Sequence, residues 1–224
     1  MPCCRRRLPR AREAGRALFD EVYRVSSDLP AAHRPKLYAF GLSLGSFMME
    51  TPFGGDVDMA NRTDGVLLAG SPAFNALNRE FTLGRDPGSP EVQPVYRDGR
   101  VVRFSNDPAA AIPPAELPWD GTRVLYLQHA SDPIVWLSPD LILHRPDWLA
   151  EPPGPDVPSG MIWIPFVTFW QVAMDMLEPV DVEPGHGHTY TLEFVDGWAA
   201  VLQPPGWTTQ QADALRTLIA QQQQ

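Results

Sequence analysis

Gly41, Ser43 and Gly45 form the motif G-x-S-x-G, which is the spacing of a turn that presents a nucleophilic serine. An apolar run of buried-strand type at 36–40 precedes the motif, and a helix is expected to begin at about residue 46. The turn between them must be tight, and glycines allow this because side chains there would collide with their neighbours. The pattern predicts that Ser43 attacks an acyl carbonyl. The structural alternative is an ordinary glycine-rich turn between a strand and a helix.

The start of the helix after the motif supplies a hydrogen-bond donor for negative charge. The first N–H groups of a helix have no acceptor within it, and the helix dipole is positive at this end. We therefore expect the backbone N–H of Leu44 to stabilise the oxyanion that forms when Ser43 attacks.

An activated serine needs a histidine base and an acid that orients the base. After this motif they follow in the order serine, acid, histidine. Asp132 comes just after an apolar run at 123–128, so it is expected at the same edge of the sheet as Ser43. These features predict that Asp132 is the acid, and the alternative is an Asx turn before the next proline. Asp64 and Asp140 are weaker choices for the acid.

Two histidines, His186 and His188, lie on a glycine-flanked loop before a helix predicted at 191–202. Either can be the base. We prefer His188 because an aromatic residue and the helix follow it directly; His186 is then a neighbour of the site. A metal pair is another interpretation, but no third Cys or His lies nearby, so no metal and no cofactor are expected. The remaining histidines are expected to be structural or on the surface: His129 at a strand end, and His33 and His144 on loops.

Three apolar runs, at 36–40, 65–70 and 123–128, are nearly continuous, and helical segments separate them. Such strands are typical of a parallel sheet that helices cover on both faces, so the predicted fold class is α/β. A hairpin with Asp98-Gly99 at its turn is predicted at 96–102. The predicted helices are 12–27, 164–177, 191–202 and 209–220.

A Trp- and Pro-rich segment at 136–177 lies between the acid and the histidines, the usual place for a lid or cap. We expect it to shield an apolar acyl chain, with ordinary aromatic core as the alternative. Residues 1–11, which begin MPCCRRRLPR, are expected to be disordered, and 221–224 to form a tail. The aromatic residues of the lid segment are Trp136, Trp148, Trp163, Phe166 and Phe169.

The composition limits the partners of the chain. Among 224 residues, 18 Lys and Arg stand against 27 Asp and Glu, a net charge of -9, which disfavours nucleic acid because phosphate contacts need clustered cations. The 25 prolines argue against a helical bundle. Cys3 and Cys4 are adjacent and form no disulfide framework. The longest uncharged run, 161–174, is shorter than the roughly 20 residues that span a bilayer, so we expect a soluble chain.

Four runs, PKLYAFGLSLGSF, RDPGSPEVQPVY, RVLYLQHASDPIVW and PGHGHTYTLEFVDGWAAV, resemble a bacterial family of α/β-hydrolases that is common in actinobacteria. In that family a membrane-embedded N-terminal region precedes a C-terminal hydrolase domain. The resemblance implies a hydrolase domain at 12–220 and a Ser–Asp–His serine hydrolase, with Ser43 as nucleophile, Asp132 as acid, and His186 or His188 as base. One position departs from the family, which usually has an acidic residue where this chain has Leu42. The resemblance leaves the substrate undefined.

The length before the motif conflicts with a complete α/β-hydrolase. In that fold the serine follows the fifth strand, whereas only 42 residues precede Ser43 here, with one predicted helix and one strand. We therefore expect a partial domain that lacks the first strands, with the strand at 36–40 as an exposed apolar edge. The second oxyanion donor is not identified. A truncated or misassigned gene start, with MPCCRRRLPR in place of the family sequence, would produce this arrangement.

The leading functional prediction is a serine hydrolase that cleaves a carboxylic ester, an acyl ester of a lipid or of the cell envelope. The alternative from another class is a non-catalytic remnant that keeps the triad residues but lacks part of the sheet. A third reading is a metal-dependent hydrolase that uses His186 and His188, which a chelator would inactivate.

Overall fold

The computed structural model describes residues 2–177 and 182–222 and contains a four-stranded parallel sheet within that part of the chain. The order across the sheet is β1-β2-β4-β3, and the strands start in step, since Tyr38 pairs with Gly65 and Gly65 with Arg123. The sheet therefore directs all its carboxyl ends toward one edge, where loops can gather a site. The strands are β1 (Tyr38–Leu42), β2 (Gly65–Ala69), β3 (Val102–Ser105) and β4 (Arg123–Leu127).

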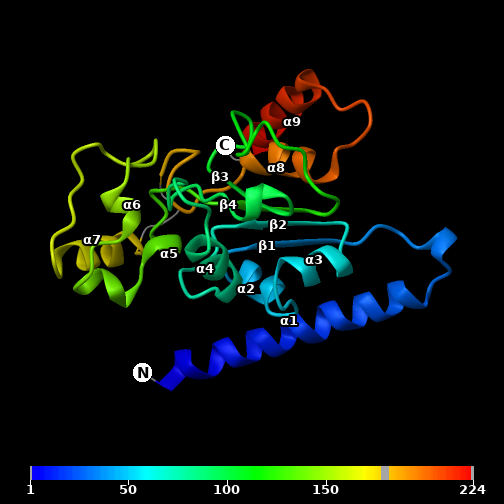
Figure 1. Cartoon of the computed structure of the whole chain (residues 1–224), viewed down its shortest axis with the longest axis horizontal. Coiled ribbons are helices and arrows are strands. Elements are labelled where there is room, and N and C mark those ends of the chain that lie inside the picture. The colour runs from blue at the N-terminus through cyan, green and yellow to red at the C-terminus, as the bar shows by residue number, and fades with distance from the viewer. Residues whose placement is uncertain (1, 178–181, 223–224) are drawn as a thin grey trace.

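Helices cover the sheet on both faces (Figure 1). The helices α1 to α4 lie on one face, and α8 and α9 lie on the other. Short 3-10 turns occur at 31–33, 97–99 and 139–142. The helices are α1 (Pro2–Asp28), α2 (Leu44–Glu50), α3 (Asp56–Arg62), α4 (Ala76–Leu83), α5 (Pro133–Trp136), α6 (Asp147–Ala150), α7 (Val167–Asp175), α8 (Glu193–Leu202) and α9 (Thr209–Gln222).

Strand β2 is buried along its whole length, and its side chains alternate between two cores. Val66 and Leu68 pack in the core beneath α4, which Phe81 anchors. Leu67 and Ala69 face the opposite core beneath α8. Because successive side chains of a strand point to opposite faces, a strand that is apolar throughout needs cover on both sides. The predicted α/β class with a doubly covered parallel sheet is confirmed.

Strand β1 lies at the edge of the sheet, and no other strand among the described residues pairs with its outer side. Phe40 is 43% exposed and Leu42 is 37% exposed. Phe194 of α8 covers part of this edge, with its ring 5.2 Å from that of Phe40. The expected apolar edge strand is therefore present in the described structure.

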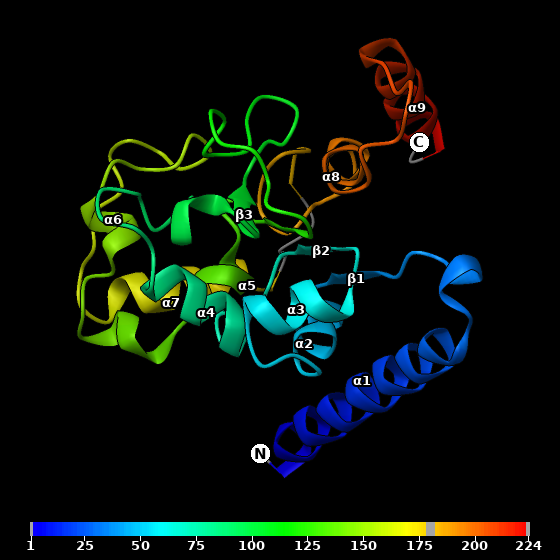
Figure 2. The same ribbon diagram turned by 45° about the vertical axis from the view of Figure 1, so that its right-hand side comes forward.

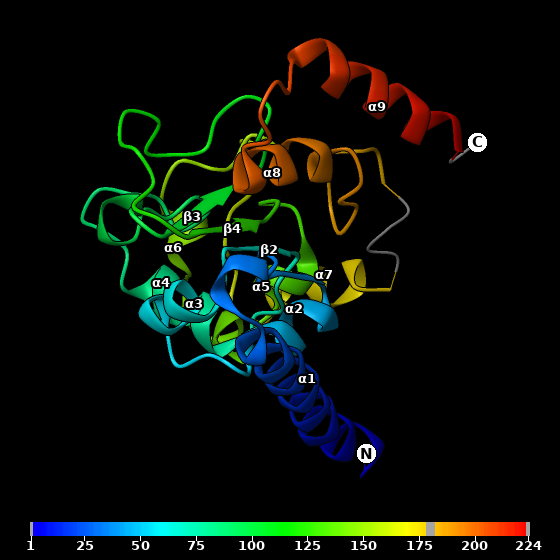
Figure 3. The same ribbon diagram turned by 90° about the vertical axis from the view of Figure 1, so that its right-hand side faces the viewer.

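The N-terminal segment differs from the expectation of disorder at 1–11. Helix α1 begins at Pro2 and continues through Pro9 to Asp28. The helix is held to the domain in its second half, where Phe19 is buried and packs edge-on against Phe53 at 4.6 Å. Its first half extends beyond the body of the domain (Figure 3). No helix in the described ranges is long and apolar enough to cross a membrane.

The hairpin predicted at 96–102 is wrong. Residues Arg97–Gly99 form a 3-10 turn, and β3 pairs with β4 in parallel. The carboxylate of Asp86 accepts the N–H groups of Arg97 at 3.2 Å and Asp98 at 2.7 Å. In the predicted hairpin, backbone carbonyls of a paired strand would have accepted such N–H groups. The Asp-Gly pair made a turn as expected, but the turn leads into a parallel edge strand.

Candidate active site

Ser43 lies at the turn between β1 and α2, at the carboxyl edge of the sheet. Its backbone has φ 56° and ψ −124°, a region that a non-glycine residue rarely adopts and that costs on the order of 1–3 kcal/mol. The surrounding structure holds this conformation, because the N–H of Ser43 donates to the carbonyl of Ala69 in β2 at 3.0 Å. The half-buried Ser43 is thus fixed to the neighbouring strand and not only to its own turn.

The two residues that flank this turn fit the same geometry. A side chain at Gly41 would put its Cβ within 2.6 Å of the backbone nitrogen of Ser46, so only glycine fits there. Leu44 is the first residue of α2, and its N–H therefore has no acceptor within the helix. The side chain of Leu44 is 53% exposed, which leaves this end of the helix open to a ligand.

Asp132 and His188 meet although 56 positions separate them in the sequence. Asp132 is fully buried, and its Oδ2 lies 2.8 Å from Nδ1 of His188. The other oxygen, Oδ1, accepts the N–H of Ile134 at 2.8 Å and caps α5. The carboxylate of Asp132 therefore both contacts His188 and forms the Asx turn, which the sequence presented as alternatives.

Tyr190 is a third group at the same carboxylate. Its hydroxyl donates to Oδ2 of Asp132 at 2.8 Å and accepts the backbone N–H of His129 at 2.9 Å. Burial, together with the charge of Asp132, raises the pKa of Tyr190 well above its usual value. The phenol therefore stays protonated and remains a donor to Asp132.

The ring of His188 packs against Gly70, the residue that follows β2. A Cβ at Gly70 would lie 2.7 Å from Nδ1 of His188 and in still closer contact with Cε1, and the φ of +52° at Gly70 also favours glycine. Gly70 directly follows Ala69, whose carbonyl holds Ser43. The imidazole thus lies beside the strand end that fixes the serine. Its Nε2 is buried and has no hydrogen-bond partner among the described residues.

The loop that carries His188 is held at Gly187 from two sides. The N–H of Gly187 donates to Oγ of Ser131 at 2.8 Å, and its carbonyl lies 2.9 Å from Nδ1 of His129. Both partners belong to the loop that carries Asp132. Ser131 also donates to Asp156 at 2.6 Å. The segment 128–132 is called the acid loop and the segment 185–189 the base loop, after the roles expected for Asp132 and His188. The acid loop contacts the base loop at residues 129, 131 and 132 and so positions it.

His129 is a buried structural residue beside the site. Its ring stacks on Tyr190 at 4.3 Å with 7° between the planes. Burial alone would lower its pKa, but Glu193 at 3.6 Å and the Gly187 carbonyl outweigh this, so the pKa of His129 is raised. Burial would likewise raise the pKa of Glu193, but the contact with His129 lowers it. Both shifts favour the charged forms of His129 and Glu193, which link the loop of Asp132 to the start of α8.

The other candidates lie away from this cluster. His186 is exposed, with Nδ1 3.4 Å from the carbonyl of Pro184. Asp64 precedes β2 at the opposite edge of the sheet and accepts the N–H of Leu37. Asp140 is exposed in the 3-10 turn at 139–142. His33 and His144 are exposed, and no group of three His, Cys, Asp or Glu side chains in the described chain is arranged as metal ligands.

Sequence reasoning did not identify three residues that build the site, Gly70, Ser131 and Tyr190. A glycine directly after a buried strand was a signal, because such a position often permits close approach of another group. Tyr190, two positions after His188, was noted only as an aromatic neighbour. Ser131 carried no signal, since its partner Gly187 is distant in the sequence.

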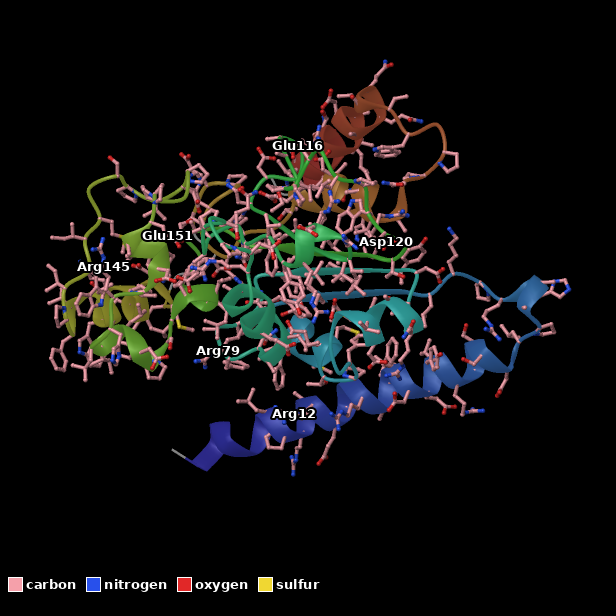
Figure 4. The ribbon with its side chains drawn as sticks, viewed as in Figure 1. Arg12, Arg79, Glu116, Asp120, Arg145 and Glu151 are labelled. Atoms are coloured by element: carbon pink, nitrogen blue, oxygen red, sulfur yellow. The ribbon has the colours of Figure 1, made fainter. Side chains whose placement is uncertain are left out.

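The helices of the segment 136–177, together with α5, gather at the end of the molecule where the strands finish (Figures 1 and 2). They pack around Trp136 and Trp148, whose rings are 5.6 Å apart. Arg85, which follows α4, binds Asp147 at 2.7 Å and Glu151 at 3.0 Å, and Figure 4 labels Glu151 in this region. A cavity of about 130 Å³ between these helices and the acid loop is lined by Asp132 and by apolar side chains that include Trp136, Trp148, Met161 and Val172.

A family model described as an alpha/beta-hydrolase family matches residues 7–215. The comparisons with curated proteins and with solved structures gave no match. The family match covers most of the chain and includes every residue of the cluster around Ser43, Asp132 and His188.

Proposed function

The chain belongs to an alpha/beta-hydrolase family, and from this premise we propose that it is a serine hydrolase of carboxylic esters. In this proposal Ser43 is the nucleophile, His188 the base and Asp132 the acid, and the N–H of Leu44 supplies one oxyanion donor. His186 has no catalytic role. The family match by itself supports a hydrolase, and the finer assignment depends on the geometry of these residues.

One observation carries the assignment. The Nδ1 of His188 is engaged by a fully buried carboxylate, while its Nε2 is buried and has no hydrogen-bond partner among the described residues. A neutral imidazole whose Nδ1–H donates to a carboxylate must have a lone pair on Nε2. Such a nitrogen, beside the strand end that fixes a strained serine, is suited to take up the serine proton.

The reaction follows from these positions. His188 Nε2 accepts the proton of Ser43 Oγ while the oxygen attacks the ester carbonyl, and Asp132 stabilises the imidazolium that forms. The negative charge on the former carbonyl oxygen is met by the Leu44 N–H. The imidazolium then protonates the leaving alcohol, and water, deprotonated by His188, hydrolyses the acyl-enzyme to regenerate Ser43.

Two features support an apolar acyl group. The cavity behind the loop of Asp132 is lined mainly by apolar residues, among them Trp136, Trp148 and Met161, together with Ser131, Asp132 and Asp175. Helix α7 and its lead-in also expose apolar side chains, among them Phe166, Trp170 and Met174. Isolated exposed apolar residues are common, but a group of them beside a site is typical of a surface that contacts apolar ligands. An acyl ester of a lipid or of the cell envelope is therefore the substrate class that we propose.

The membrane-embedded region of relatives and their actinobacterial distribution stay predictions from the resemblance. The non-catalytic alternative also has an observation in its favour. Strand β1, which positions Ser43, lies at the edge of the described sheet, and the loop that supplies a second oxyanion donor in α/β-hydrolases has not been identified among the described residues. Losing one such donor costs about 10²–10³ in rate.

The test is hydrolysis of p-nitrophenyl esters of increasing acyl length by the purified chain, by Ser43→Ala and by His186→Ala. We expect activity that rises with acyl length, is lost in Ser43→Ala and is kept in His186→Ala and in the presence of a chelator. Inactivity of the folded parent chain would support the non-catalytic alternative, and loss of activity with the chelator would support the metal-dependent one.

A further inference from the structure

A chain of buried hydrogen bonds leads from the backbone of Ser43 into helix α4. The hydroxyl of Ser46 donates to the carbonyl of Ser43 at 2.6 Å, next to the N–H of Ser46 at 2.9 Å. The Nδ2 of Asn75 donates to Oγ of Ser46 at 3.2 Å and to Oε1 of Glu50 at 3.0 Å. Ser46, Asn75 and Glu50 are all buried, so water does not compete for these bonds.

Glu50 anchors this chain. It is the last residue of α2 and is only 3% exposed. Its Oε2 accepts the N–H of Leu77 at 3.1 Å and, at 3.5 Å, that of Asn78, which belong to the first turn of α4. The N-cap residue Asn75 makes no side-chain cap bond of its own, so Glu50 caps α4 in its place. Burial raises the pKa of Glu50 to about 7, although the bonds from Asn75, Leu77 and Asn78 lower it.

The ionised carboxylate fixes the direction of every bond in the chain. A carboxylate only accepts hydrogen bonds, so the amide of Asn75 must turn its NH₂ toward Glu50. The same NH₂ then donates to Ser46, and the single hydroxyl proton of Ser46 is left for the carbonyl of Ser43. This arrangement leaves one polar atom unsatisfied: Oδ1 of Asn75 is buried and has no hydrogen-bond partner among the described residues.

We propose that Glu50 is a positioning residue for the nucleophile, because it orients Asn75 and Ser46 so that the Ser46 hydroxyl holds the Ser43 carbonyl. This inference rests on the proposed function only in naming Ser43 as the nucleophile. Glu50 does not touch a substrate. It acts on the orientation of the Ser43 carbonyl, at the residue whose φ of 56° makes the turn strained.

Glu50→Gln is the informative variant because it keeps the shape of the side chain. With its oxygen bound to the N–H of Leu77, the Gln amide presents its NH₂ to Asn75, which then turns Oδ1 toward both the Gln and Ser46. The Ser46 hydroxyl donates to that oxygen and leaves the carbonyl of Ser43. Glu91→Gln is the matched control, since Glu91 is a half-buried carboxylate that, like Glu50, accepts a backbone N–H, that of Trp148 at 2.6 Å.

The experiment is fluorophosphonate labelling of the full chain at pH 8.5, where Glu50 is ionised. For Glu50→Gln we expect the saturating labelling rate constant to fall about tenfold or more, with the half-saturating probe concentration unchanged, because a small displacement of a reacting atom costs rate. Glu91→Gln should label like the parent. Asn75→Ala should reproduce the effect, and Glu50→Gln/Asn75→Ala should show no further loss, since both act through one chain. A purely structural role would lower the labelled fraction of the protein and not the rate constant of the folded fraction.

Amide hydrogen exchange of the peptide that spans residues 41–47 keeps this inference separate from the proposed function. We expect faster exchange of this peptide in Glu50→Gln and no change in Glu91→Gln, whether or not Ser43 is labelled. A parent that is not labelled, with faster exchange in Glu50→Gln, contradicts the proposed function and supports the positioning role. Unchanged exchange, or a labelling rate constant within twofold of the parent, overturns the positioning role.

Discussion

The proposed nucleophile and the proposed acid–base pair are built in different ways. The turn that carries Ser43 lies within ten residues, 41–50, which hold both glycines of the motif and Glu50, and two distant residues, Ala69 and Asn75, support it. The pair of Asp132 and His188 instead joins residues 56 positions apart, and its supports are equally distant in the sequence. The first half of the site is therefore a strained local turn with two distant supports, whereas the second half is assembled entirely by long-range contacts.

The two halves of the site should therefore respond differently to single substitutions. The strained turn at Ser43 needs a rigid support on each side, which the carbonyl of Ala69 and the Glu50 chain provide. The acid–base pair has no strained backbone at Asp132, and it depends on many ordinary bonds around Gly187. Single substitutions in the second half should each cost little, unless they change the carboxylate itself or the space that the imidazole occupies.

The largest effect is expected at the carboxylate itself. In Asp132→Asn, the amide no longer favours the Nδ1–H tautomer of His188, so Nε2 loses the lone pair that takes up the serine proton. We expect kcat for ester hydrolysis to fall by about 10⁴, as in triads that lose the acid. Asp140→Asn is the control, since Asp140 is exposed and lies apart from the histidine. If Asp132→Asn keeps more than a tenth of the parent kcat, the acid has been misassigned.

On the nucleophile side, a pH effect on stability is expected from Glu50. Its pKa is raised from 4.5 to about 7 in the folded protein, so between these values the folded state holds a proton that the unfolded chain has released. The free energy of unfolding must then fall as the pH rises through this window, by about 3 kcal/mol from this group alone. Glu50→Gln lacks this titration.

Urea unfolding of the parent and of Glu50→Gln at pH 4.5, 6 and 8 measures this effect. The difference between the two proteins should shift in favour of the variant by about 3 kcal/mol across the range. If this stability difference and the slower labelling are both found, then the ionised Glu50 lowers the free energy of unfolding at neutral pH while it holds the turn at Ser43. A pH-independent difference would argue against a raised pKa.

The space for the imidazole is tested by Gly70→Ala. The new methyl group would collide with the ring of His188, so we expect kcat to fall about 100-fold. The φ of +52° also costs alanine on the order of 1–2 kcal/mol in stability. Gly88→Ala separates the two causes, because Gly88 has φ +89° but open space where a Cβ would lie. Equal kinetic effects of the two substitutions would show that the collision is unimportant.

The smallest effect is expected for one of the bonds around Gly187. Ser131→Ala removes the acceptor of the Gly187 N–H and the hydroxyl bond to Asp156. The bond from the backbone N–H of Ser131 to Asp156 and the contact of His129 with Gly187 remain. Loss of about 1 kcal/mol of positioning corresponds to roughly a fivefold decrease in kcat. Ser138→Ala removes a comparable bond, to the N–H of Asp140, and should leave kcat unchanged. A loss above 100-fold in Ser131→Ala would mean that the base loop has no second support.

The same contrast explains what the sequence could predict. The turn at Ser43 was recognisable because the motif, the strand before it and the helix after it are contiguous. The doubly covered parallel sheet was also predictable, since strands such as 65–69 are apolar at every position. The position of Asp132 at the same edge of the sheet as Ser43 was predictable from its place after a strand, because the carboxyl ends of parallel strands meet at one edge.

What the sequence could not predict depends on contacts between distant segments. The proposal of His188 over His186 depends on the loop conformation, in which Gly187 is bound on both sides and His188, unlike His186, is buried. The parallel pairing of β3 was missed because the carboxylate of Asp86 stabilises the turn before it. The role proposed for Glu50 required knowledge that the end of α2 lies against the start of α4.

The most direct test of Ser43 as the nucleophile is to locate a fluorophosphonate adduct by mass spectrometry in the parent chain, with Ser43→Ala and His188→Ala as controls. We expect one adduct, on Ser43, which is absent from Ser43→Ala and forms much more slowly in His188→Ala. An adduct on another residue, or none in a sample that unfolds cooperatively, would contradict the assignment of Ser43 as an activated nucleophile.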